Sequence, residues 1–203
     1  MSIDDQLAAL QAVALLQDAR LLSHDGINTL KGLEAAPGVQ AFGTVQAGAL
    51  RAAQLYALGE SLSSEEESEV FAGCRATSEQ IRLLSVATLE AILSAHPSDP
   101  GTSWSLLSAL YDPSDEVLAR GLNVLTRKVD AIEQRARSTA LNAVASAYRR
   151  GRHIVRLSSV QAARALESLA PNEQMRRLLD AAATDPSWEV RRLVEDRPVG
   201  IGD

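Results

Sequence analysis

Residues 185–191 read Asp-Pro-Ser-Trp-Glu-Val-Arg, and residues 112–118 read Asp-Pro-Ser-Asp-Glu-Val-Leu. Aligning the chain on the valine of this phrase gives five copies, which centre on Val45-Gln46, Ile81-Arg82, Val117-Leu118, Val155-Arg156 and Val190-Arg191. Successive copies lie 36, 36, 38 and 35 residues apart. Self-similarity at this period is typical of stacked supersecondary units. The sequence therefore predicts a repeat protein.

A small residue follows the valine or isoleucine of most copies by four positions. These positions hold Ala49, Ser85, Gly121, Ser159 and, in the last copy, Val194. Residues four apart lie on one face of a helix. We therefore expect the small residues to lie where helices of adjacent units touch, and the last copy to be a cap.

The composition favours helices throughout. Hydrophobic residues make up 46% of the 203 residues, but aromatic residues only 3%, so the core must consist mainly of alanine and aliphatic side chains. Segments of alternating polarity are nearly absent, which argues against strands. Turn residues and helix caps predict a leading helix over 2–22 and five helix pairs. The first helices are expected at 26–35, 65–74, 102–111, 130–150 and 172–184, and the second helices at 39–59, 78–95, 115–128, 153–169 and 187–195.

The turn and the start of the second helix resemble the HEAT repeat, an armadillo-type family of helical hairpins. The residues that carry the resemblance are an acidic residue in the turn, then Val-Arg, then a small residue; Asp185 with Val190-Arg191 shows the fullest form. The resemblance implies an all-α protein built as a right-handed α-solenoid of about five stacked antiparallel helix pairs. One elongated domain is then expected over 1–203, with a leading helix in 1–25, the pairs in 26–195 and a frayed tail at 196–203.

The resemblance also implies structural roles for the repeated residues. In the family, the turn aspartate and the helix arginine pair and tie successive units together. These roles fall on Asp112 and Asp185 and on Arg82, Arg156 and Arg191, while Val117, Val155 and Val190 are expected to pack between the helices of each pair.

Charge is distributed unevenly along the chain. The net charge is −6, but residues 1–117 hold 5 basic and 16 acidic residues and residues 118–203 hold 15 basic and 10 acidic ones, which gives −11 and +5. We call one cluster in the second half the basic ridge: Arg127, Lys128, Arg149, Arg150, Arg152 and Arg156. It has two interpretations, a solvated, charge-rich surface or a docking site for carboxylate or phosphate groups.

A non-enzymatic interaction scaffold is the function that the pattern favours. A protein or peptide partner, expected to be acidic, would lie along a concave face formed by the second helices, at Asn123, Arg127, Gln161 and Arg164. The alternative is a HEAT-like protein that binds nucleic acid through the basic ridge, which the negative net charge and the scarcity of aromatic residues disfavour. Head-to-tail self-association of the acidic and basic halves is a third possibility.

Enzyme chemistry is not predicted. The three histidines, His24, His96 and His153, lie far apart in the sequence, and the single cysteine, Cys74, has no companion at ligand spacing, so neither a metal nor a cofactor is expected. The lone cysteine suits a reducing compartment, and no apolar run is long enough to span a bilayer. A cytoplasmic location is therefore expected, with no membrane partner.

Overall fold

The computed structural model describes residues 62–195, and these residues are all-helical. They form eight α-helices and one short 3-10 helix, with no strand among them. The predicted helices at 2–22, 26–35 and 39–59, the Val45-Gln46 copy and the tail at 196–203 lie outside the described residues. The chain divides into two compact units, residues 1–92 and residues 93–203.

Two helices begin in the first unit. Helix α4 spans Ser64–Gly73, and α5 spans Glu79–Ala95 and contains the boundary between the units. Ser63 caps α4 through a capping box, because its hydroxyl accepts from the Glu66 amide while the Glu66 carboxylate accepts from the Ser63 amide. This reciprocal cap fixes where α4 begins.

The second unit contains three helix pairs joined by short turns. Helices α6 (Pro100–Ala109) and α7 (Asp115–Arg127) form the first pair, α8 (Gln134–Arg150) and α9 (His153–Leu169) the second, and α10 (Glu173–Ala182) and α11 (Trp188–Glu195) the third. The 3-10 helix η2 (Val129–Ala131) lies between α7 and α8. The predicted second helices agree with α5, α7, α9 and α11 to within one residue at each end.

The first helices differ more from their predicted ranges. Helix α6 begins two residues earlier than expected, because Asp99 caps it and Pro100 takes the first helical position, which needs no amide hydrogen bond. The single helix expected at 130–150 is instead η2 followed by α8, which begins only at Gln134.

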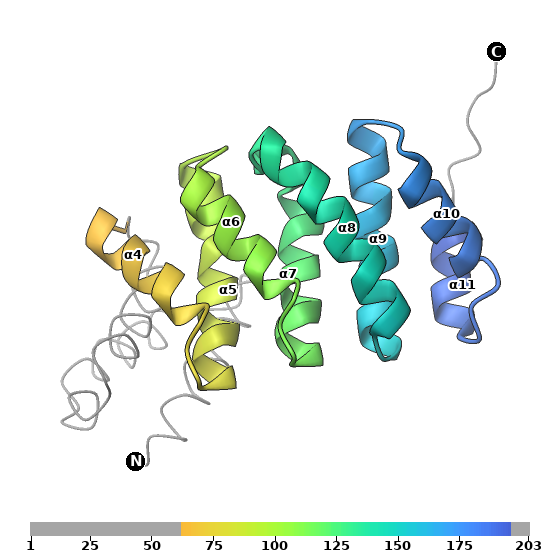
Figure 1. Ribbon diagram of the computed structural model, residues 1–203, viewed down its shortest axis with the longest axis horizontal. Helices are drawn as coiled ribbons and strands as arrows, with labels where there is room; N and C mark the ends of the chain where they lie inside the picture. The colour runs from red at the N-terminus through yellow and green to blue at the C-terminus, as the bar shows by residue number, and fades with distance from the viewer. Residues whose placement is uncertain (1–61, 196–203) are drawn as a thin grey trace, which may run out of the picture. The chain divides into compact units, whose positions relative to one another are not determined.

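The helices of the second unit lie in two rows. The members of each pair contact one another, and in addition α9 contacts α7 and α11 while α8 contacts α6 and α10. Figure 1 shows the first helices, α6, α8 and α10, in one row and the second helices, α7, α9 and α11, in the other. Each second helix therefore presents one face to its row neighbours and another to its own partner.

The repeated apolar positions form the core between the rows. Val117, Val155 and Val190 are completely buried, and Ile81 is 1% exposed in the first unit. Leucine and alanine fill the surrounding positions, so the protein buries apolar area without large aromatic side chains.

The small residue after the valine has a different neighbour from the one expected. A Cβ atom on Gly121 would lie 3.2 Å from Leu110 Cδ2 and 3.4 Å from Ala109 Cβ. Both of those residues belong to the α6 end of the same pair, so Gly121 permits close packing within its pair. Ser159 is fully buried, and its hydroxyl donates to the Val155 carbonyl at 2.7 Å.

Candidate functional site

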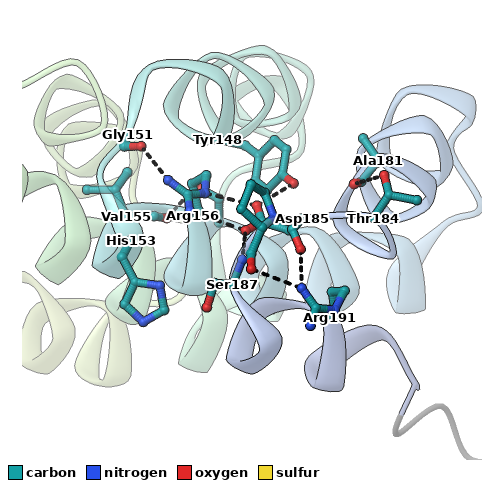
Figure 2. A network of polar contacts seen from close by, with 12 residues as sticks. Tyr148, Gly151, His153, Val155, Arg156, Ala181, Thr184, Asp185, Ser187 and Arg191 are labelled. Atoms are coloured by element: carbon teal, nitrogen blue, oxygen red, sulfur yellow. Dashed lines mark hydrogen bonds and ion pairs between the residues drawn. The ribbon is translucent and has the colours of Figure 1, made fainter.

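A buried carboxylate in one turn contacts side chains of the preceding helix pair. Asp185, in the turn between α10 and α11, has only 2% of its side chain exposed. Its Oδ2 accepts from Nε of Arg156 on α9 and from the hydroxyl of Tyr148 on α8, both at 2.9 Å, while its Oδ1 accepts from Nη2 of Arg156 at 3.2 Å. The Ser187 amide also donates to Oδ1. Figure 2 shows these donors converging on Asp185, so the second pair is tied to the third.

The network changes the pKa of each member. Burial alone would raise the pKa of Asp185, but the hydrogen bonds from Arg156, Ser187 and Tyr148 outweigh it and hold the pKa below its usual value. For Tyr148, burial and the neighbouring Asp185 carboxylate raise the pKa to about 12. The hydrogen bond to Asp185 raises the pKa of Arg156 above its already high value. All three groups therefore keep their usual charge at neutral pH, as expected of a structural tie.

The other two repeated arginines bond to carbonyl oxygens in the turns that precede them. Arg191 Nη1 donates to the carbonyls of Asp185 and Pro186, and Arg82 Nη1 donates to the carbonyls of Ala76 and Thr77. Those bonds satisfy turn carbonyls that the helices leave open. Arg82 and Arg191 thus hydrogen-bond to the turn that precedes their own helix. Arg156 does so too, through the Gly151 carbonyl, and also contacts Asp185 in the following turn.

The second pair reverses the charge pattern of its turn. Arg150 stands five residues before Val155, where the neighbouring copies have Asp112 and Asp185. Its Nη2 donates to the carbonyls of Leu110 and Asp112 in the preceding turn, at 3.3 and 3.5 Å. Arg150, the last residue of α8, therefore links the second pair to the preceding turn through its guanidinium.

The basic ridge is not continuous. Arg152 lies beside the start of α7, because its Nε is 3.3 Å from Asp115 Oδ2. Arg127 and Lys128 lie at the other end of α7, and a 13-residue helix separates its ends by about 20 Å. Arg149, Arg150, Arg152 and Arg156 therefore gather at the edge of the turns, while Arg127 and Lys128 belong to the opposite edge.

A second set of predicted residues does come together. Asn123 and Arg127 on α7 and Gln161 and Arg164 on α9 line one open groove of about 540 Å³ on the row of second helices. Thr126, Ala165 and Leu193 complete its described lining, the last from α11. Arg164 Nη1 donates to the Leu193 carbonyl, which links α9 to α11 within the lining of the groove.

Two features of the turn edge were not expected from the sequence. Tyr111, Ile154 and Trp188 are about half exposed or more there, one at each turn of the second unit. His153 also contacts Glu189, which joins the starts of α9 and α11. Neither feature repeats at the period of the valine, so the alignment of copies gave no signal for them.

Comparison with known proteins finds no matching family model, no similar curated protein and no similar solved structure. Within residues 62–195 no helix is both long and apolar enough to cross a membrane. Acidic, histidine and cysteine side chains in that range form no group of three with metal-binding geometry. The groove and the turn network are therefore interpreted from their own geometry.

Proposed function

We propose that this protein is a non-enzymatic interaction scaffold of the HEAT-repeat type, a right-handed α-solenoid of about five helix pairs. The two rows of helices and the Arg156–Asp185 tie support the architecture. Cys74, the single cysteine of the chain, is buried and forms no disulfide within it, which suits a reducing compartment, and we place the protein in the cytoplasm.

The groove on α7, α9 and α11 is the observation that supports the scaffold function. Its described lining combines amide, hydroxyl and guanidinium groups with two apolar residues and contains no carboxylate. Such a surface supplies hydrogen bonds and positive charge to a partner with an acidic segment. The partner is a protein or peptide that lies along the row of second helices.

Nucleic-acid binding through the basic ridge has less support. Its residues lie at two opposite edges, and Arg150, Arg152 and Arg156 bond to neighbouring turns. A nucleic-acid complex is recognised by the ratio of absorbance at 260 and 280 nm of the purified protein, which we expect to be that of protein alone.

A peptide-display selection tests the scaffold function. The unmodified protein is expected to enrich peptides that the Ala165→Trp variant does not retain, because an indole at this position fills the groove. Ala181→Trp is the matched control, since Ala181 is exposed on α10, away from the groove. Melting temperatures show whether each variant is folded. Absence of enrichment, or equal enrichment by Ala165→Trp, would refute the proposed function.

A further inference from the structure

The polar side chains that line the groove differ in what they already contact. Arg127, Arg164 and the Thr126 hydroxyl interact with other groups of the protein. In the described part of the chain, by contrast, the half-buried side-chain amides of Asn123 and Gln161 make no hydrogen bond. Each amide has two N–H donors and one carbonyl acceptor. These two amides can therefore bind a ligand without breaking an existing contact.

Asn123 and Gln161 occupy the same position in successive copies of the repeat. Each lies six residues after the valine of its copy, Val117 on α7 and Val155 on α9. The two helices pack against each other, and the axes of packed helices lie about 8–10 Å apart. The two amides are therefore offset by one step of the row of second helices, about 8–10 Å.

A side-chain amide is complementary to the main chain of a peptide. Its N–H can donate to the carbonyl of a residue while its carbonyl accepts from the N–H of that residue. In a polyproline II helix, each residue rises about 3.1 Å and three make a turn, so the same side recurs every 9.3 Å or so, with its N–H and carbonyl groups unpaired. In an extended strand, the same edge recurs only at about 6.6 Å and about 13 Å. The polyproline II repeat thus matches the offset of the two amides.

We propose that the groove binds a partner segment in the polyproline II conformation through its main chain, with one residue paired to Asn123 and a second residue, three positions away, paired to Gln161. This inference rests on the proposed function and specifies how the same site holds its peptide. Both contact residues need an N–H, so neither is proline. The two residues between them can be proline, whose fixed φ lowers the cost of ordering the segment. The segment therefore has the form X-Pro-Pro-X, in which X is any residue except proline.

The test uses fluorescein-labelled proline peptides in which two alanines are the only residues with a main-chain N–H. In the reference peptide, Pro-Pro-Ala-Pro-Pro-Ala-Pro-Pro, the alanines are three positions apart, and in two others they are two or four apart. Fluorescence anisotropy with the full chain measures each dissociation constant. We expect the reference peptide to bind about tenfold more tightly than the others, because only there do both alanines meet an amide. N-methylation of one alanine removes its N–H and should cost about the same factor.

Two protein variants assign the contacts. Asn123→Leu and Gln161→Met keep the approximate size of each side chain and remove its amide. In each variant, N-methylation of one of the two alanines should no longer weaken binding, because the partner of that alanine is gone. Gln134→Met, at the exposed start of α8, is the matched control and should bind every peptide as the parent does. Melting temperatures show whether each variant is folded.

The outcomes separate this inference from the scaffold function. Equal binding at separations of two, three and four, or an N-methylation cost that persists in both groove variants, would overturn the inference. If displayed peptides bind and Ala165→Trp blocks them, but the proline–alanine peptides do not bind at up to about 1 mM, the scaffold function stands and this inference fails. If neither kind of peptide binds, both proposals fail.

Discussion

Removal of the Asp185 carboxylate should destabilise the second unit strongly. Asp185→Ala leaves the Arg156 guanidinium and the Tyr148 hydroxyl without their shared acceptor. Loss of one partner of a buried ion pair costs about 3–5 kcal/mol. A quarter of the Arg156 side chain is exposed and can regain water, so we expect a value near the lower limit, about 3 kcal/mol. The melting temperature should fall by about 6–12 °C in a protein of this length.

Chemical denaturation provides the assay, and a second ion pair provides the control. Asp115→Ala removes the partner of Arg152, a pair that also joins adjacent turns but has 88% of the arginine side chain exposed. An exposed pair is worth at most about 1 kcal/mol. A loss for Asp185→Ala as small as the loss for Asp115→Ala would refute the assignment of Asp185 as the main tie between these pairs.

The pH dependence of the Asp185 contribution has a defined sign. Folding lowers the pKa of the Asp185 carboxyl, so its contribution to the free energy of unfolding is complete above the unfolded-state pKa of about 3.9. The contribution disappears as pH falls through the lower pKa of the folded state. The difference in stability between the parent and Asp185→Asn should therefore be constant near neutral pH and shrink below about pH 4. A difference that grows on acidification would contradict the role assigned to the network.

Three further predictions concern neighbouring residues. Gly151→Ala should destabilise the protein by about 1–3 kcal/mol in thermal denaturation, because its Cβ would lie 2.4 Å from Val155 Cγ1; an unchanged melting temperature would contradict this packing. Folding raises the pKa of Tyr148 to about 12, so its contribution to stability is present below about pH 10 and lost as pH rises toward 12. Absorbance titration of the parent and of Tyr148→Phe can follow this, because the difference between the two curves reports the ionisation of Tyr148. Arg150→Gln should lower the melting temperature more than Arg149→Gln, because Arg150 donates to carbonyls of the preceding turn; equal shifts would show that those bonds contribute nothing measurable.

The helices and the groove were largely predictable from local signals. The valine period and turns such as Asp185-Pro186-Ser187 placed the second helices to within one residue, because helix boundaries depend on caps and turn residues close in sequence. Asn123 and Arg127 are four residues apart on α7, and Gln161 and Arg164 are three apart on α9. Residues at these spacings lie on one face of a helix, so each helix brings its own two side chains together. Parallel alignment of α7 and α9 then joins the two sets.

The parts that escaped prediction depend on contacts between distant residues. Tyr148 donates to Asp185 across 37 positions, and no periodic signal marks this tyrosine. The basic ridge is interrupted for a different reason: Arg127 and Arg152 are both near the ends of helices, but at opposite ends of the helix pairs. The length of helix α7 alone gives the distance between the two groups, so this separation can be predicted from the sequence.

Site-directed cross-linking tests the groove most directly. Cys74 is buried and is the single native cysteine, so Gln161→Cys introduces one accessible thiol in the groove and Arg149→Cys one at the turn edge. A peptide that the display selection enriches, with a thiol-reactive chloroacetyl group at one end, is incubated with each variant, and the adduct is measured by mass spectrometry. The groove account predicts an adduct with Gln161→Cys that excess unlabelled peptide suppresses, and little adduct with Arg149→Cys. Equal labelling of the two variants, or preferential labelling at the turn edge, would contradict it.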